Sequence, residues 1–320
     1  MNEKKILSIL VPVFNEEENV LPLYEAVTKE LVLLQDRYTY EFIFTDNCST
    51  DRTFEELEKL AAADHRVRVF RFSRNFGFQK SIATGFRFAR GHAAIQLDCD
   101  LQDSPQLIAD FIRYWEQGYA VVYGIRRSRR EGWLISGVRK LFYRLINWLS
   151  EDELPLDAGD FRLVDRRIVE ALKNHYDAHP YLRGAIATMG YAQKGIPYDR
   201  QARRHGLSKF SMSDLMGIAL DGILNHSIVP LRIATYSGLL IAATTFAAIV
   251  LYAVTKVFFG QNWPEGFATT TVLLLTGISL NALFLGVIGE YLGRIYQQVK
   301  GRPITLIDKT IDHFQNEIPE

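Results

Sequence analysis

The sequence lacks the features of a disulfide-stabilised, secreted or nucleic-acid-binding protein. It contains only two cysteines in 320 residues, too few for a disulfide framework or a structural zinc site. Its 37 basic and 37 acidic side chains leave no net charge, so no overall field attracts nucleic acid. The first residues lack the long apolar core and small-residue cleavage site of a secretory signal. We therefore expect a mature cytoplasmic amino terminus.

Charged residues are missing from two long segments near the carboxyl terminus. Residues 233–255 and 266–289 contain no Asp, Glu, Lys or Arg. A helix needs about 20 residues to cross the hydrocarbon core, and each segment is long enough. Buried helices of a soluble core rarely run so far without a charge. We therefore expect two transmembrane helices, at about 233–255 and 267–289.

The charges that flank these helices predict their orientation. The link between them holds one basic residue, whereas four basic residues lie at the outer flanks, namely Arg232, Arg294, Lys300 and Arg302. The positive-inside rule then places both ends in the cytoplasm. We expect a membrane hairpin over residues 227–293 and a cytoplasmic tail over 294–320. Glycines spaced by four near the end of the second helix would permit self-association as a dimer or tetramer.

Residues 1–226 show a different pattern, in which short β-rich runs alternate with amphipathic stretches. The expected strands are residues 6–13, 41–46, 67–72, 93–98 and 120–124. The expected helices are residues 17–34, 51–63, 79–90 and 105–117. This alternation predicts an α/β domain, a mostly parallel sheet with helices on both faces. Neither Gly-x-Gly-x-x-Gly after the first strand nor Gly-x4-Gly-Lys-Ser/Thr occurs, which counts against dinucleotide-dependent dehydrogenases and P-loop enzymes.

Acidic side chains gather where the expected fourth strand ends. Asp98 and Asp100 follow an apolar run, so their carboxylates can converge on one hard cation as the chain turns. Mg²⁺ or Mn²⁺ held by one or two carboxylates, with water and phosphate oxygens completing its shell, is the expected arrangement. Such an ion neutralises charge on a diphosphate leaving group. Asp-x-Asp alone is a weak signal, but a strand end is where ligands bind on such sheets.

Four motifs in this order resemble those of the family-2, GT-A-type glycosyltransferases, at residues 11–19, 46–51, 73–77 and 98–103. More narrowly, the chain resembles the polyisoprenyl-phosphate sugar transferases, the class of dolichol-phosphate mannose synthase and the bactoprenol glucosyltransferases. Residues 159–163 and 204–209 and the two-helix carboxyl end extend the similarity over nearly the whole chain. The resemblance implies a GT-A fold, Rossmann-like, joined to a transmembrane hairpin.

The resemblance also implies an activity and a set of site residues. The protein would transfer a sugar from a nucleotide diphosphate donor to the phosphate of a membrane polyprenol, with inversion, at the cytoplasmic face of the bacterial inner membrane. The donor would be bound by Pro12, Phe14, Glu16, Asp46, Asn47, Asp98, Gln102 and Arg204. The metal would lie among Asp98, Asp100 and Gln102, and the acceptor phosphate would meet Arg126, Arg139, Tyr143 and Lys209.

The sequence departs from the family where Asp-Asp-Gly-Ser-Thr-Asp is usual. Asn47 stands at the second aspartate, where it cannot ionise but can still hydrogen-bond a ribose. Cys48 stands at the glycine, and its Cβ would strain a left-handed turn, so we expect an ordinary turn there. Neither cysteine has a nearby histidine, so we expect small packing residues and no thiol nucleophile.

Basic residues outnumber acidic ones in two segments, residues 113–144 and 194–209. The first adjoins an apolar pattern at helical spacing, which predicts an amphipathic helix at about 133–149, lying in the membrane interface with arginines at headgroup level. A second such helix is expected at about 211–226. Arginines there would bind a lipid phosphate bidentately. Residues 203–209 resemble the mobile loop that closes over the donor.

An acidic stretch follows the first basic segment. We expect Asp100, Asp157 and Asp160 to be the catalytic carboxylates. Asp157 and Asp160 could orient arginines, contact sugar hydroxyls or take the acceptor's last proton, and a purely structural ion pair is an equal alternative. A phosphate monoester is already anionic at neutral pH and needs little help from a base.

The sequence thus predicts a metal-dependent polyisoprenyl-phosphate glycosyltransferase with a nucleotide sugar, a polyprenyl phosphate and the bilayer as partners. Glucose from UDP-glucose is the expected sugar, with mannose, N-acetylglucosamine and aminoarabinose as alternatives. A processive synthase would need Gln-x-x-Arg-Trp, and no tryptophan follows an arginine. A transferase with a soluble acceptor would need no basic interfacial helix. Because Asn47 and Cys48 depart from the family motif, a non-catalytic membrane scaffold is the alternative function outside the enzymes.

Overall fold

The computed structural model describes residues 4–126, 158–174, 177–178, 180–199, 229–259 and 266–314. The two expected amphipathic helices, at about 133–149 and 211–226, lie outside the described residues. So do five expected site residues, namely Arg139, Tyr143, Asp157, Arg204 and Lys209.

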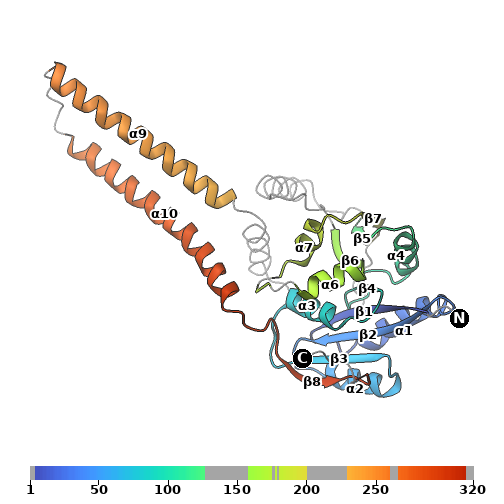
Figure 1. Ribbon diagram of the computed structural model, residues 1–320. Helices are drawn as coiled ribbons and strands as arrows, with labels where there is room; N and C mark the ends of the chain where they lie inside the picture. Colours follow the sequence, from blue (N-terminus) through green and yellow to red (C-terminus); the bar gives the residue numbers. More distant parts are fainter. Residues whose placement is uncertain are drawn as a thin grey trace.

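Eight strands form one mixed sheet in the order β7-β5-β6-β4-β1-β2-β3-β8 (Figure 1). Its central run, β4-β1-β2-β3, is parallel throughout, and β5 and β7 are also parallel. β6 lies antiparallel between β4 and β5, and β8 lies antiparallel to β3. The strands are β1 (Lys5–Val13), β2 (Tyr38–Asp46), β3 (Val67–Phe72), β4 (Ala93–Gln96), β5 (Val121–Arg126), β6 (Ala158–Asp165), β7 (Gln193–Tyr198) and β8 (Ile307–Ile311).

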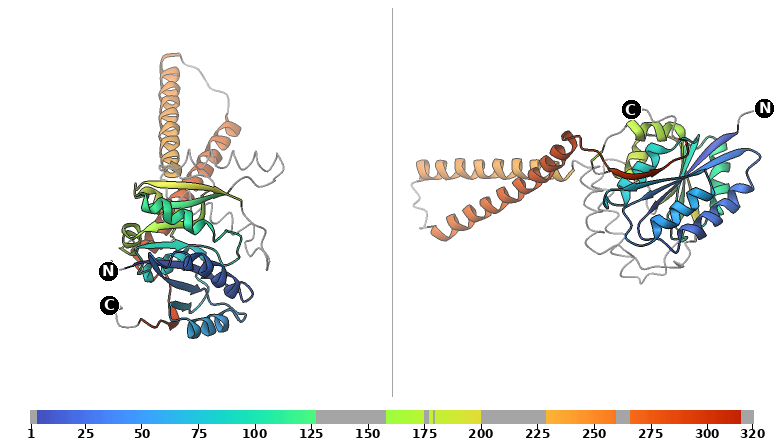
Figure 2. Two further views of the ribbon diagram at one scale, coloured as in Figure 1. Left: turned by 90° about the vertical axis from the view of Figure 1, so that its right-hand side faces the viewer. Right: turned by 90° about the horizontal axis from the view of Figure 1, so that it is seen from below.

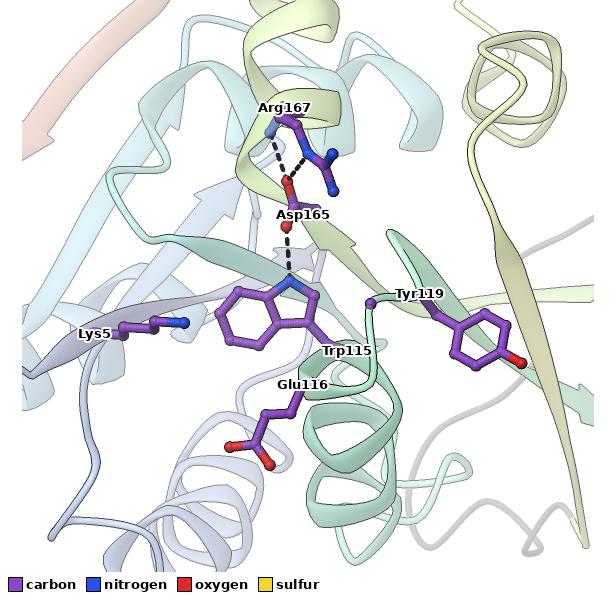
Figure 3. A pocket seen from close by; sticks show the side chains of 7 residues that line it. Lys5, Trp115, Glu116, Tyr119, Asp165 and Arg167 are labelled. Atoms are coloured by element: carbon purple, nitrogen blue, oxygen red, sulfur yellow. Dashed lines mark hydrogen bonds and ion pairs between the residues drawn. The ribbon is translucent and has the colours of Figure 1, made fainter.

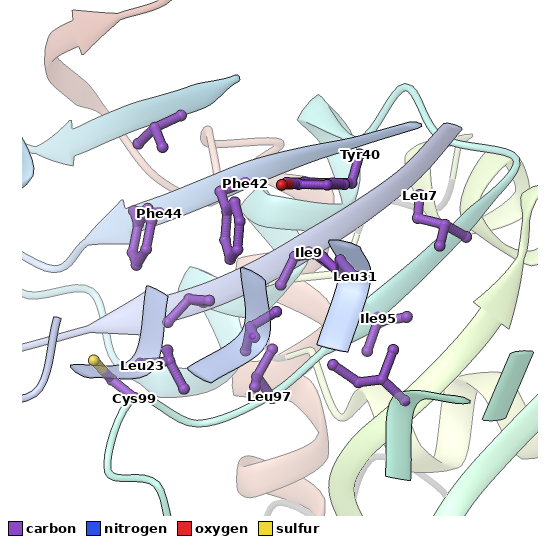
Figure 4. Close-up of a cluster of buried hydrophobic side chains, with 14 of the residues drawn as sticks. Leu7, Ile9, Leu23, Leu31, Tyr40, Phe42, Phe44, Ile95, Leu97 and Cys99 are labelled. Atoms are coloured by element: carbon purple, nitrogen blue, oxygen red, sulfur yellow. The ribbon is translucent and has the colours of Figure 1, made fainter. Parts of the chain in front are cut away.

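Helices cover both faces of this sheet, because side chains alternate along each strand. One face packs Leu7, Ile9 and Val11 of β1 against α1, α2 and α4, in the core that Figure 4 shows in part. The other face packs Leu10 against α3, α6 and α7. These helices are α1 (Val20–Val32), α2 (Thr53–Ala63), α3 (Phe78–Phe88), α4 (Leu107–Glu116), α6 (Arg166–Asn174) and α7 (Leu182–Thr188).

The sequence-based assignment of the first 126 residues is confirmed. Each of the five expected strands and four expected helices is present, with ends displaced by no more than three residues. The expected GT-A-type α/β layering with helices on both faces is confirmed as well. The sheet is more mixed than expected, because β6 and β8 run against their neighbours.

The carboxyl-terminal segment, expected to be a tail, adds strand β8 to the edge of the sheet beside β3. A buried ion network holds it there. Arg68, 2% exposed, donates to Asp312 at 2.8 Å and to Glu41 at 2.8 Å. The backbone N–H of Ser73 donates to the carbonyl of Leu306 at 3.0 Å, and the imidazole of His313 lies 3.1 Å from the carbonyl oxygen of Ala61. The chain that leaves the last helix is therefore tied back to the sheet.

We predict that Asp312→Ala lowers the free energy of unfolding by about 2 kcal/mol. The change removes one of the two carboxylates that pair with the buried Arg68 and leaves Glu41 as its remaining counter-ion. Burial alone would raise the pKa of Asp312, but hydrogen bonds from Arg68 and the Phe314 N–H outweigh it and hold the pKa below its ordinary value. The carboxylate's contribution is therefore complete above about pH 4 and lost as the pH falls through the lowered pKa. Urea unfolding at pH 7 and pH 3 measures this difference. Asp308→Ala, an exposed change on strand β8, is the control and should cost less than about 0.5 kcal/mol.

Two long helices, α9 (Val229–Phe259) and α10 (Phe267–Val299), extend away from the sheet and lie beside each other (Figures 1 and 2). A side chain at Gly238 of α9 would lie 3.7 Å from the ring of Phe284 in α10. Within the described residues, one helical segment, Thr276–Val299, is long and apolar enough to cross a membrane, with a mean hydropathy of 1.3. None of its described residues is classed as buried inside the protein. It overlaps the expected second span and ends ten residues later.

Candidate functional site

The expected site residues that the structure describes gather along one edge of the sheet, the edge formed by the carboxyl ends of its parallel strands. β1, β2 and β4 are parallel, so Phe14, Asp46 and Asp98 all follow strands that end at this edge. β5 ends there with Arg126, beside the end of β7 at Tyr198. β6 runs the other way and brings Asp160 to the same edge near its start. The topology therefore places Asp98, Asp160 and Arg126 at the same edge of the sheet, with Phe14 and Asp46 at the ends of neighbouring strands.

Asp98 is the electrostatic centre of this group. Asp98 is partly exposed as a residue, but its Oδ1 atom is buried, and this burial together with the neighbouring carboxylates of Asp103, Asp160 and Asp100 raises its pKa to about 8. Arg126 opposes this rise but does not cancel it. Asp100 is 5% exposed and accepts a hydrogen bond from the Gln102 N–H at 3.1 Å. Four carboxylates in so small a region create a strong local demand for positive charge.

Asp160 is held by arginines. Arg183 of α7 donates two hydrogen bonds to its carboxylate, at 2.7 and 2.6 Å. Burial alone would raise the pKa of Asp160, but the charge and hydrogen bonds of Arg183 lower it below its ordinary value. Arg162 on β6, 4% exposed, lies nearby and donates to the carbonyl of Gly159 at 2.9 Å. Asp160 therefore stays ionised as a counter-ion, and its expected part in catalysis stays a prediction.

The turn after Asp98 has an unusual backbone. Leu101 adopts a left-handed conformation with φ of 54°, which few non-glycine residues with a bulky side chain adopt. Its side chain is buried, at 6% exposure, within the core cluster. Burial of this leucine thus turns the chain sharply and leaves Gln102 partly exposed beside Asp100. Such strain is typical of loops held in place for binding.

The two loops expected to bind the nucleoside are joined by hydrogen bonds. The N–H groups of Asn15 and Glu16 donate to the hydroxyls of Ser49 and Thr53, at 2.9 and 2.7 Å. Asp46 is fully buried and accepts from the N–H and hydroxyl of Ser49. Burial raises the pKa of Asp46, against the lowering effect of the bonds from Ser49. Pro12 lies within β1, while Phe14 and Glu16 are partly exposed at the loop surface.

Asn47 ties this region to a third loop. Its amide nitrogen donates to the Oδ1 of Asn75 at 2.8 Å, and its amide oxygen accepts from the N–H of Phe76 at 2.8 Å. Both ends of the amide thus hold the loop after β3, so the residue that departs from the usual aspartate has a structural use here. A carboxylate could accept from Phe76 but could not donate to Asn75.

The expectation of an ordinary turn at Cys48 is wrong. Cys48 is left-handed, with φ of 62°. A conformation that costs a non-glycine residue about 1 kcal/mol persists because the hydrogen bonds between the surrounding loops outweigh that cost. Both cysteines are free, and Cys99 is buried in the core, as expected for a packing residue, whereas Cys48 is only partly buried.

We predict that Asn47→Asp destabilises the protein although it restores the more usual residue. The change replaces a hydrogen bond with two facing oxygens, one of them charged, so the free energy of unfolding should fall by about 1–2 kcal/mol. Thermal unfolding measures this. Asn75→Asp is the matched control, because it leaves the Asn47 amide a carboxylate to donate to and should cost less. A variant as stable as the wild type would contradict the role given to Asn47.

The residues after β4 suit a divalent metal. Asp98, Asp100 and Gln102 offer carboxylate and amide oxygens, the donors that Mg²⁺ and Mn²⁺ prefer. Among the described residues, no group of three or more His, Cys, Asp or Glu side chains that could hold a metal ion is present. An ion here would therefore take ligands from water and from the phosphates of a substrate.

A shallow cavity of about 180 Å³ lies at the opposite edge of the sheet, near the start of β1 (Figure 3). Its wall includes Trp115, whose indole N–H donates to Asp165 at 2.8 Å, and Lys5, whose ammonium lies 5.1 Å from the indole ring centroid. These contacts join β1, α4 and β6 at the end remote from Asp98. The cavity is thus separate from the carboxylate site.

Comparison with known proteins decides the family. Residues 8–173, which include every strand from β1 to β6, match the profile described as Glycosyl transferase family 2. The chain belongs to this family. It is therefore a glycosyltransferase of GT-A fold, and the carboxylate edge lies mostly within the matched residues.

Relatives of this glycosyltransferase match over nearly its whole length. An uncharacterised glycosyltransferase of Bacillus subtilis, YkcC, is 36% identical over 304 residues, with 95% of this chain and 93% of the relative covered. A prophage-derived bactoprenol glucosyl transferase of Shigella flexneri is 35% identical over 307 residues, covering 95% and 98%. A prophage bactoprenol glucosyl transferase homologue of Escherichia coli is 34% identical over 304 residues, with the same coverage. The similarity to the bactoprenol glucosyltransferases expected from the motifs is confirmed.

The sequence analysis did not single out three residues of the site. Arg183 and Tyr198 belong to α7 and β7, which the sequence analysis left unassigned. Arg162 lies in a motif that carried the resemblance, but nothing pointed to its burial. Alternation along residues 158–165 was the signal that could have revealed β6 and, with it, the inward position of Arg162.

Proposed function

We propose that this glycosyltransferase moves a sugar from a nucleotide diphosphate sugar, with UDP-glucose as the expected donor, to the phosphate of a polyprenyl lipid at the cytoplasmic membrane face. One observation carries the proposal. The Asp98 carboxylate cluster and the Arg126 guanidinium lie side by side at one sheet edge, so sites for a cation and for a phosphate adjoin. The names of the relatives from Shigella flexneri and Escherichia coli supply the lipid and the sugar.

The reaction needs two anionic groups to approach each other. An oxygen of the acceptor phosphate attacks the anomeric carbon, a new C–O bond forms with inversion, and the bond to the nucleoside diphosphate breaks. A divalent ion bound at Asp98 and Asp100 would supply charge neutralisation for the departing diphosphate. Arg126 binds the incoming phosphate and Asp160 stays ionised against Arg183. Asp157, outside the described residues, is proposed to orient the acceptor or to take its last proton.

The membrane part of the proposal rests on α9 and α10. Leu283, Leu285 and Leu292 are about 60% exposed on α10. A soluble protein rarely exposes so extended an apolar surface. We propose that α10 crosses the bilayer, and that α9 does so too because residues 233–255 carry no charge. Both outer ends of the hairpin would then lie in the cytoplasm. The interfacial helix at about 133–149 would then present its arginines to lipid phosphates.

A panel assay tests the proposal. Purified full-length protein in detergent is given one radiolabelled nucleotide sugar at a time. The sugar of this donor is glucose, mannose, N-acetylglucosamine or aminoarabinose. Each is paired with polyprenyl phosphate, with polyprenol lacking the phosphate, or with no lipid. We expect lipid-linked sugar with UDP-glucose and polyprenyl phosphate alone. Product with another sugar would correct the proposed identity of the donor. If no donor and acceptor pair gave product, a non-catalytic membrane scaffold would explain the protein better than an enzyme.

A further inference from the structure

Tyr198 occupies a place in the site that no motif assigned. It is the last residue of β7 and 6% exposed. Its phenol hydroxyl donates a hydrogen bond to the carboxylate of Asp103 and accepts one from the Nε of Arg126 at 3.5 Å. One hydroxyl thus joins an acid of the carboxylate cluster to the arginine at the end of β5.

The ring of Tyr198 is fixed by its surroundings. A side chain at Gly124 of β5 would lie 2.6 Å from the ring atom Cε1, closer than any real contact, so the ring fits only because residue 124 is glycine. Phe161 of β6 packs edge-on against the ring at 6.3 Å between centroids. The hydroxyl therefore has little freedom to leave Arg126.

Arg126 is held on further sides. Its Nη2 lies 3.9 Å from the carboxylate of Asp103, and a side chain at Gly159 would be 3.5 Å from its Nε and Nη2. The guanidinium is thus packed over the backbone next to Asp160. Carboxylates nearby attract this cation but also cancel part of its charge, whereas a hydroxyl orients it and leaves its charge intact.

We propose that Tyr198 is a positioning residue, which fixes the Arg126 guanidinium so that it meets the acceptor phosphate already oriented. This inference rests on the proposed function, in which Arg126 binds that phosphate. A free arginine side chain has many rotamers, and part of this conformational entropy is lost when it binds a ligand. Holding Arg126 in place beforehand removes part of that cost from acceptor binding.

Tyr198→Phe tests the inference, because it removes the hydroxyl and keeps the ring. Initial rates are measured on purified full-length protein, varying polyprenyl phosphate at saturating nucleotide sugar and then the reverse. We expect the KM for polyprenyl phosphate to rise about fivefold, the effect of one lost hydrogen bond, with the KM for the donor within about twofold of wild type. Gly124→Ala displaces the same ring and should raise the acceptor KM in the same direction.

Tyr38→Phe is the matched control. The Tyr38 hydroxyl also donates to a carboxylate, Glu116 at 2.5 Å, but at the opposite edge of the sheet. We expect this change to affect thermal stability alone and neither KM. A Tyr198→Phe enzyme whose acceptor KM equals that of the wild type, or whose two KM values rise equally, would overturn the positioning role.

Arg126→Ala separates this inference from the function beneath it. Without lipid-linked sugar from the wild type, the proposed function fails. When product forms and Arg126→Ala raises the acceptor KM but Tyr198→Phe does not, the inference about Tyr198 alone fails. When Arg126→Ala leaves the acceptor KM unchanged, Arg126 does not bind the acceptor phosphate. The positioning role of Tyr198 is then wrong as well.

Discussion

Asp98→Asn should lower kcat/KM for sugar transfer at least about a hundredfold while making the metal-free protein more stable. The loss follows because the carboxylate at the centre of the cluster is the strongest candidate ligand for the divalent ion, whose charge stabilisation is worth several kcal/mol. The gain follows because Asp98 is surrounded by Asp100, Asp103 and Asp160, and its negative charge is unfavourable there without a cation. Function and stability are thus opposed at this residue.

Thermal unfolding in chelator and in excess Mn²⁺ measures the second half of this prediction. In chelator, Asp98→Asn should melt about 2–4 °C above the wild type, the shift that about 1 kcal/mol produces in a chain of this size. In Mn²⁺ the order should reverse, because an ion that binds the native state stabilises only the protein that retains its ligands. Asp110→Asn removes a carboxylate from the exposed face of α4 and serves as control. A variant less stable than the wild type in chelator would contradict the picture of an unbalanced carboxylate cluster.

The second large effect is expected on stability, from Asp160→Asn. This change leaves Arg183, whose side chain is 34% exposed, without its bidentate partner, and it leaves the buried Arg162 without the carboxylate that most favours its charge. Removing one partner of a buried ion pair costs about 3 kcal/mol or more. The melting temperature should therefore fall by about 6–12 °C. If Asp160 were only a catalytic base, without a structural ion pair, its substitution would not lower the melting temperature in this way. The measurement therefore also separates a structural from a purely catalytic role.

A double-mutant cycle with Arg183→Met completes the test. The pair Asp160→Asn and Arg183→Met together should cost less than the sum of the single changes, because the double variant leaves no isolated charge. Asp165→Asn is the matched control on the same strand, since its partner Arg167 is 61% exposed and the loss should be near 1 kcal/mol. Additive costs at Asp160 and Arg183 would show that the two side chains do not stabilise each other.

Local patterns predicted the positions of Asp46, Asp98 and Asp100 because each lies at or just after the end of a short β-rich run that is visible in the sequence. Arg183, Tyr198 and Asp312 could not be found in this way. Each acts through a partner far along the chain, such as Arg68 for Asp312, and such pairings leave no periodic signal. Only the assembled sheet shows that the segment after α10 returns to its edge.

Cys48 shows where a correct local argument gives the wrong structure. A side chain does disfavour a left-handed backbone, and glycine is usual at this place in the family. The turn is set instead by its neighbours, since the buried Asp46 carboxylate takes both donors of Ser49. Several hydrogen bonds between loops outweigh the local preference of one residue.

Transfer of radiolabelled glucose from UDP-glucose to polyprenyl phosphate by the purified protein, with and without divalent metal, tests the central claim most directly. The account predicts lipid-linked glucose in Mg²⁺ or Mn²⁺, none in chelator, and recovery when metal is restored. Equal product formation in chelator would contradict the assignment of the Asp98 cluster as a metal and diphosphate site.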